Sequence, residues 1–318
     1  MNAVTLAERL SALDVSGISA LVVEVGDLDQ AVAFYERILG LKLAGRDVLP
    51  GCGAHAAFKT PAGQWLALVA SPDRLDLRET GVHQAYRVSV AGKTAISARL
   101  LAEGIEIKTY KEDRPAEDGD NFYFFDPAGN RIQLVLAKSA TASDGVSGID
   151  HAAVQVADML WNEEFYGSEL RLPISHRVGW KTADYARARK WAAGEEDMAP
   201  GTRRLDQRYS VMVDRKTVPR ANMQMFVDVG GGSVLGVYLA NKHFQEPLEE
   251  QLVGAPRTVL AVPNRAALDG AARALAAHQR PYQGPVAHPD SSPFEASLYF
   301  KDLGGNFLEL CVARKGAS

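Results

Sequence analysis

The sequence predicts an α+β fold made of four βαβββ modules. The first observation is a repeated motif. Residues 123–133 and 299–309 each predict an aromatic strand, a tight Asp-x-x-Gly-Asn turn and a second strand. That order is typical of a β-hairpin. The second is a β-branched strand followed by a helix with a Phe-Tyr pair, present at 18–40 and again at 149–167. Internal repeats of this kind decide the architecture.

The elements follow in the same order in each module. Asp27 and Asp29 are acidic residues suited to the start of the first helix, and Gly40 is suited to end it. The second helix is expected over 94–103, with Gly104 after it, and the fourth over 265–279. The first strands of the modules are expected at 18–25, 82–88, 149–156 and 257–262, and the closing hairpins at 61–68, 123–133, 228–237 and 299–309.

The repeats divide the chain into two predicted domains. Residues 1–140 hold the first two modules and are expected to be non-catalytic, whereas 148–318 hold the other two and the active site. The segment 138–148 is small and polar, which is typical of a linker. The third module is lengthened by an insert near 176–221, which is either a lid over a site or a loop that contacts a partner.

Composition excludes several classes of protein. The 318 residues are 47% hydrophobic and 23% charged, and the net charge of −4 gives no basic surface for nucleic acid. No apolar run is long enough to span a bilayer, and the first residues do not read as a signal peptide, so we expect a cytoplasmic protein without a membrane partner. Cys52 and Cys311 are expected to be free thiols. A homodimer is compatible with the sequence but not required by it.

These modules resemble the vicinal oxygen chelate superfamily over residues 18–313. That group includes glyoxalase I, fosfomycin- and bleomycin-resistance proteins, and the type I extradiol dioxygenases, whose four-module form is the most similar. The resemblance implies that the modules are paired into two cupped, incomplete β-barrel domains and that metal ligands stand at two positions per module. The first-strand positions are Ala20, His83, His151 and Arg257, and the hairpin positions are Ala67, Gln133, Gly236 and Glu309.

With the halves as domains, the N-terminal half offers one good ligand, His83, and one poor one, Gln133. The C-terminal half offers His151 and Glu309, which match two of the three ligands of an Fe(II) or Mn(II) facial triad. Arg257 stands where the second histidine is expected, and a guanidinium cannot ligate a cation. The third protein ligand is therefore missing, and a metal-free site is the alternative.

The resemblance also suggests catalytic residues in the C-terminal cup. Tyr299 matches the tyrosine that contacts the substrate oxygen in extradiol enzymes, and His288 is the upstream histidine for acid–base work. The function implied is extradiol, catechol-type ring cleavage of a small oxygenated aromatic. The alternative is a metal-independent glyoxalase-like or resistance-like protein, in which Arg257 pairs with Glu309 and holds a small anionic or carbonyl ligand.

Overall fold

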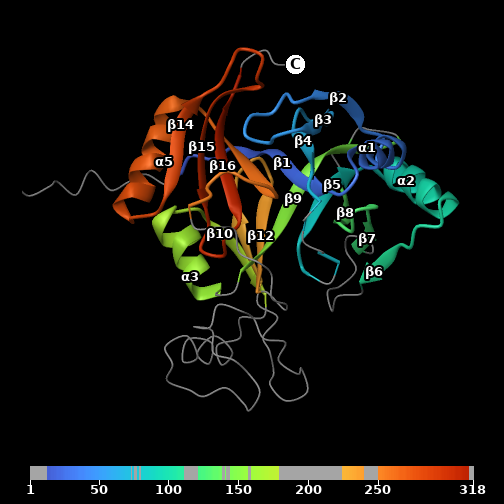
Figure 1. Cartoon of the computed structure of the whole chain (residues 1–318). Helices are drawn as coiled ribbons and strands as arrows, with labels where there is room; N and C mark the ends of the chain where they lie inside the picture. The colour runs from blue at the N-terminus through green and yellow to red at the C-terminus, as the bar shows by residue number, and fades with distance from the viewer. Residues whose placement is uncertain are drawn as a thin grey trace, which may run out of the picture.

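The computed structural model describes residues 13–72, 74, 77–78, 80–110, 121–137, 140, 144–156, 159–178, 224–239 and 250–314. They form the four predicted βαβββ modules, so the predicted α+β fold is confirmed (Figure 1). The first two modules comprise β1 (Gly17–Val25), α1 (Leu28–Arg37), β2 (Lys42–Arg46), β3 (His55–Lys59), β4 (Trp65–Ala70), β5 (His83–Val88), α2 (Val90–Ala102), β6 (Lys108–Tyr110), β7 (Asn121–Phe125) and β8 (Arg131–Leu136).

The third and fourth modules repeat the order, with the π-helical turn η2 extending α3. They comprise β9 (Val146–Val156), α3 (Met159–Glu164), η2 (Phe165–Glu169), β10 (Ile174–Val178), β11 (Gln224–Asp228), β12 (Val234–Leu239), β13 (Arg257–Val262), α5 (Arg265–Ala277), β14 (Tyr282–Ala287), β15 (Phe294–Lys301) and β16 (Phe307–Ala313). Nearly all of the predicted insert 176–221 lies outside the described residues, as do residues 138, 139 and 141–143 of the predicted linker.

Side-chain caps set the helix starts. Asp27 accepts a hydrogen bond from Gln30 N at 2.9 Å, as the acidic start of α1 predicts, and Gly40 follows the helix with φ +69°. Helix α2 begins before the predicted residue 94, because the Ser89 hydroxyl accepts from Gly92 N at 3.0 Å and so starts the helix at Val90. The cap was not recognised in the sequence.

The strands form two eight-stranded sheets that mix the halves of the chain. Sheet A has the order β14-β15-β16-β13-β1-β4-β3-β2 and combines the first and fourth modules. Sheet B has the order β10-β11-β12-β9-β5-β8-β7-β6 and combines the second and third. The expected pairing of consecutive modules into one cup is therefore wrong. Each first strand pairs with the antiparallel first strand of a module from the other half, β1 with β13 and β5 with β9.

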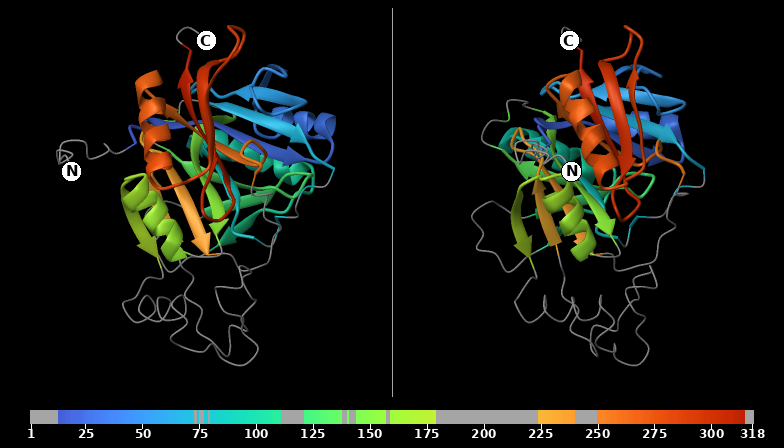
Figure 2. Two further views of the ribbon diagram at one scale, coloured as in Figure 1. Left: turned by 60° about the vertical axis from the view of Figure 1, so that its left-hand side comes forward. Right: turned by 90° about the vertical axis from the view of Figure 1, so that its left-hand side faces the viewer.

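The halves are nevertheless visible in how the helices gather. Helices α1 and α2 lie on one side of the molecule and α3 and α5 on the opposite side, with the strands between them (Figures 1 and 2). Arg37 at the end of α1 pairs with Glu103 at the end of α2, and Arg280 after α5 pairs with Glu169 in η2. Modules of one half thus meet through helices, whereas the sheets run across both halves.

The repeated hairpin motif, at 123–133 and 299–309, joins consecutive modules. The Tyr35 hydroxyl of α1 donates to Asp126 Oδ2 at 3.1 Å in the turn of the second module. Asn130 Nδ2 donates to the same carboxylate and to Glu24 O of β1, each at 2.9 Å. The fourth module is fixed to the third in the same way through Tyr166, Asp302 and Asn306. The Asp-x-x-Gly-Asn turn is therefore a docking element between modules.

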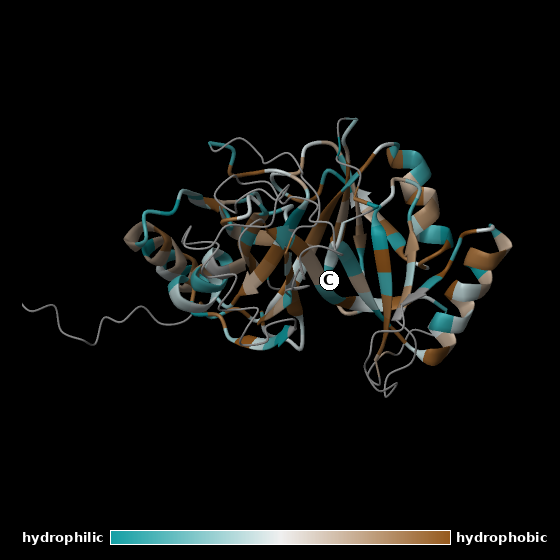
Figure 3. Ribbon diagram, turned by 90° about the horizontal axis from the view of Figure 1, so that it is seen from below, coloured by the Kyte–Doolittle hydropathy of each residue, from teal (hydrophilic) through white to brown (hydrophobic). Residues whose placement is uncertain are grey.

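One large hydrophobic cluster runs under both sheets and includes the Phe-Tyr pairs of α1 and η2, Phe34, Tyr35, Phe165 and Tyr166. Apolar residues are prominent on the strands, while the helices show both apolar and polar residues (Figure 3). A smaller cluster fills the other face of sheet A. Within the described residues, no helix combines the length and the apolar character that crossing a membrane requires.

Candidate metal site on sheet B

The sheet pairing regroups the eight ligand positions. His83, Gln133, His151 and Gly236 come together on sheet B, because β5, β8, β9 and β12 are its central strands. Ala20, Ala67, Arg257 and Glu309 come together on sheet A. His151 and Glu309, the predicted metal pair, therefore lie in different sheets. The physical reason is the β5–β9 pairing, which brings His151 to His83 instead.

Register explains how the two histidines reach each other. His83 pairs with Ala153, and Ala85 pairs with His151, so the imidazoles occupy one diagonal of a four-residue square and two methyl groups occupy the other. Ala85 and Ala153 are almost fully buried. Their small side chains leave room above the sheet for the imidazoles to lean together, and His83 Nε2 lies 3.0 Å from His151 Nε2.

The outer nitrogens of both rings are fixed by groups that only accept hydrogen bonds. His83 Nδ1 lies 2.7 Å from Gly81 O, and His151 Nδ1 lies 2.8 Å from Asp150 Oδ1. Each Nδ1 must therefore carry the hydrogen, and in a neutral imidazole each Nε2 then presents a lone pair to the other. Two lone pairs at this distance repel unless a proton or a cation lies between them. Histidine metal ligands are typically oriented by such a carbonyl or carboxylate.

The side-chain amide oxygen of Gln133 is the third candidate metal-ligand atom on this face. It is paired with Ala85 across β8 and β5, it is 6% exposed, and its side chain is in hydrogen-bonding range of the His83 ring. Burial and the neighbouring His151 lower the pKa of His83 to about 3, so this imidazole is neutral, as a metal ligand must be. Among the described residues no three His, Cys, Asp or Glu side chains cluster as metal ligands. The set here is two imidazoles and an amide oxygen.

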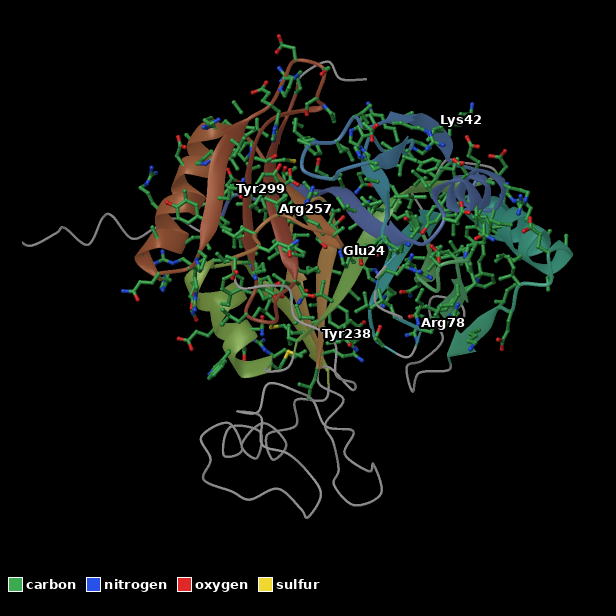
Figure 4. The ribbon with its side chains drawn as sticks, viewed as in Figure 1. Glu24, Lys42, Arg78, Tyr238, Arg257 and Tyr299 are labelled. Atoms are coloured by element: carbon green, nitrogen blue, oxygen red, sulfur yellow. The ribbon has the colours of Figure 1, made fainter. Side chains whose placement is uncertain are left out.

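Aromatic and cationic side chains surround the histidine pair. The rings of Tyr123 and Tyr238 each lie 5.8 Å from the His83 ring, on opposite strands of the sheet, and both pack edge to face. The Arg131 guanidinium stacks over Tyr123 at 6.0 Å. Tyr238 is on β12 of sheet B and in Figure 4 lies well below Arg257 and Tyr299, which are on sheet A.

Sheet A holds an ion pair where sheet B holds the histidines. Arg257 Nε lies 2.8 Å from Glu309 Oε2, and both side chains are at most 1% exposed. The Ser297 hydroxyl donates to Glu309 Oε1 at 2.6 Å. The Arg257–Glu309 pairing that the sequence suggested is therefore present. Desolvation raises the pKa of Glu309, and the Arg257 charge opposes that shift.

The remaining Arg257 donors are used by the chain itself. Nη1 donates to Gly51 O at 3.0 Å and Gly254 O at 2.7 Å. Nη2 donates to Pro50 O at 3.1 Å and to Cys52 Sγ at 3.2 Å. Arg257 therefore fastens the loop after β2 over sheet A. In this arrangement the guanidinium N–H groups of Arg257 already bond the chain, so none is available for the anionic or carbonyl ligand that the alternative hypothesis proposed.

Tyr299 and His288, the other predicted catalytic residues, also belong to sheet A. Tyr299 is 3% exposed, and its ring lies 5.4 Å from the Arg257 guanidinium (Figure 4). His288 directly follows β14, and burial lowers its pKa. Neither residue is on the sheet that carries His151. The structure thus brings Tyr299, Arg257 and Glu309 together, and separates them from His151.

His83 and Gln133 occupy ligand positions in the sequence, but they were not predicted to bind a metal. The N-terminal half, taken alone, offers too few ligands. Combining the second and third modules would have given His, His and Gln. No sequence signal chose that combination, since it depends on which first strands pair.

The fold and site define a two-sheet protein of four βαβββ modules with a histidine pair at the centre of one sheet. Residues 17–134 match the model of the Glyoxalase/Bleomycin resistance protein/Dioxygenase superfamily. The metallothiol transferase FosB of Shouchella clausii (strain KSM-K16) is 30% identical over 122 residues, which is 38% of this chain and 80% of that protein. The chain belongs to this superfamily.

Solved structures share the fold over nearly the whole chain. One is a protein of Bacillus subtilis subsp. subtilis str. 168 whose description as a dioxygenase is itself provisional, with a TM-score of 0.63, 15% identity, and coverage of 96% of this chain and 87% of that one. Glyoxalase I from Zea mays has a TM-score of 0.54 and 16% identity, with 93% and 92% covered. At these identities the likeness concerns the fold.

Proposed function

We propose that this chain is a metal-dependent enzyme of the superfamily, which holds a divalent first-row metal through His83, His151 and Gln133. The observation that carries the proposal is the 3.0 Å approach of two Nε2 atoms whose partner nitrogens already bear the hydrogens. Two imidazoles suit zinc, iron, nickel or copper, and the neutral amide oxygen adds no charge. The proposed substrate is a small molecule with two adjacent oxygens.

The chain's own groups would orient the ligands and the substrate. Asp150 keeps the hydrogen of His151 on Nδ1, and Arg87 Nε in turn holds Asp150 Oδ2 at 3.0 Å. Bound there, a metal would supply Lewis-acid polarisation of a substrate oxygen. Tyr123 and Tyr238 provide ring surface on either side, and the positive charge of Arg131 favours a substrate with negative character.

Catechol-type ring cleavage remains one candidate reaction, now on sheet B rather than in the C-terminal half. The two histidines and the flanking aromatic rings support it, with Gln133 in the place of the usual carboxylate. Thiol transfer to a small molecule is the second candidate, because FosB, the relative at 30% identity, is named a metallothiol transferase. Two assays distinguish these reactions. Ring cleavage predicts oxygen uptake with catechol and Fe(II), whereas thiol transfer predicts thiol consumption with Mn(II) or Zn(II).

Metal binding is the first experiment. Chelator-treated protein is titrated with Zn(II), Ni(II), Mn(II) and, without oxygen, Fe(II) by calorimetry. We expect one site per chain in the wild type, lost in His83→Ala and His151→Ala. His278→Ala is the control, because His278 follows helix α5 on the surface. Equal stoichiometry and affinity in all four proteins would contradict the proposal.

A further inference from the structure

Gln155 is a buried side chain on the same face of sheet B as the histidine pair. It is four residues after His151 on β9, and strand alternation places both side chains on one side. The β9–β12 register is unbroken from His151 to Val156, so no bulge reverses that alternation. Gln155 pairs with Tyr238 in this register, and Tyr238 packs on His83.

The amide of Gln155 also lies beside the backbone that orients His83. A Cβ on Gly81 would be 3.2 Å from Gln155 Nε2 and 3.4 Å from Tyr238 Cδ1, so the amide and the aromatic ring fill the space left by this glycine. Gly81 O is the acceptor that fixes His83 Nδ1. Gln155 therefore lies next to Gly81, whose carbonyl orients the proposed metal ligand His83.

Among the residues that the structure describes, Gln155 Oε1 has no hydrogen-bond partner, and the side chain is only 2% exposed. A buried amide oxygen left unpaired destabilises the folded chain, so an occupant of the site that donates a hydrogen bond would remove this cost. Gln84, a second buried glutamine, shows the contrast. Its Nε2 donates to Tyr35 Oη at 2.7 Å and its Oε1 accepts from Tyr86 Oη at 2.5 Å.

We propose that Gln155 is a specificity-determining residue, which accepts a hydrogen bond from a hydroxyl or N–H group of the ligand held at the histidine pair. This rests on the proposed metal site. The ligand class is a small chelating molecule that carries a hydrogen-bond donor next to its metal-bound oxygens. A site built to receive such a donor rejects analogues that lack it, because the buried oxygen then stays unpaired.

The test uses two probes that differ in one donor. Acetohydroxamic acid chelates a divalent metal through two adjacent oxygens and keeps an N–H group, which N-methylacetohydroxamic acid lacks. Both are titrated into metal-loaded, full-length protein. We expect the wild type to prefer acetohydroxamic acid by about tenfold or more, and Gln155→Met to reduce the ratio to about one. Metal affinity should be unchanged in this variant.

Stability supplies the control for a merely structural role. Gln155→Met should leave the melting temperature unchanged or raise it, because it removes an unpaired polar atom, whereas Gln84→Met should lower it. A probe preference that persists in Gln155→Met would overturn the inference, as would a loss of stability equal to that of Gln84→Met. Absence of metal binding in the wild type would instead overturn the proposed function on which it depends.

Discussion

Tyr166 donates its hydroxyl hydrogen to Asp302 Oδ2 across 2.8 Å, although the two residues are 136 positions apart. Both side chains are buried, and the same carboxylate accepts from Asn306 Nδ2 at 2.9 Å. Tyr35 and Asp126 form the same contact between the first two modules. The pair explains why the repeated turn and the repeated Phe-Tyr helix occur together: each is half of a lock between consecutive modules.

Removing one half of the lock should weaken the fold. Tyr166→Phe keeps the ring but deletes a donor to a buried carboxylate, so we expect the free energy of unfolding to fall by about 1–3 kcal/mol. Denaturant unfolding followed by circular dichroism measures it. Tyr35→Phe should give a similar loss at the equivalent site. An unchanged midpoint and slope in both variants would show that the contact contributes nothing to stability.

The buried Arg257–Glu309 pair should be structural. Glu309→Ala leaves a guanidinium buried without its counter-charge, and we expect a loss of about 3–5 kcal/mol in unfolding free energy. The double change Arg257→Met with Glu309→Leu removes both charges and should recover much of that loss. Denaturant unfolding of the three proteins gives the coupling. The double change should leave metal binding unaffected. Loss of metal binding would instead indicate that Glu309 is a metal ligand.

Adding a carboxylate to sheet B should strengthen metal binding. Gln133→Glu places a charged oxygen where the amide stands, beside His83, and a carboxylate attracts a divalent cation more strongly than an amide does. We expect at least about a tenfold fall in Kd for Mn(II), measured by calorimetry. Gln64→Glu is the matched control, because the Gln64 side chain bonds the backbone of Ile18 and Ile149 and not a histidine ring. An equal gain in both variants would contradict the assignment.

Cys52 should be unreactive in the folded protein. Burial raises the pKa of its thiol to about 11 from an ordinary 9.0, although Arg257 acts in the opposite direction. The folded thiol therefore keeps its proton between these values while the unfolded thiol loses it, so stability should fall as pH rises from 9.0 to about 11. Unfolding titrations of wild type and Cys52→Ala across this range test the slope. Thiol labelling at pH 8 should require unfolding, and fast labelling of native protein would contradict this.

Much of the fold could be predicted from residue patterns, because the elements depend on local chemistry. Asp27 caps α1, Gly40 follows its end, and the turns at Asp126 and Asp302 recur because each aspartate accepts from nearby backbone N–H groups. The eight ligand positions came from the resemblance to the superfamily, counted from the end of each first strand and from the glycine of each hairpin. The sequence offered the Arg257–Glu309 pair as the alternative to a metal site with His151 and Glu309, and the pair is present.

The candidate site could not be predicted in the same way. Whether His151 meets His83 or Glu309 depends on which first strands share hydrogen bonds, and the backbone groups of all four first strands are chemically alike. The Gln155 amide oxygen, which has no hydrogen-bond partner among the described residues, is likewise visible only after Gly81 and Tyr238 are packed around the side chain.

The sequence by itself determined the four βαβββ modules and the recurring Asp-x-x-Gly-Asn turns, and its resemblance to the superfamily indicated the eight ligand positions. Tertiary structure alone decided that β5 pairs with β9 and β1 with β13, which places two imidazoles together on sheet B and encloses Arg257 with Glu309 on sheet A. The reason is that local interactions specify each helix and strand, whereas several pairings of the strand edges are chemically similar. Only the packing of the whole chain selects one of these pairings.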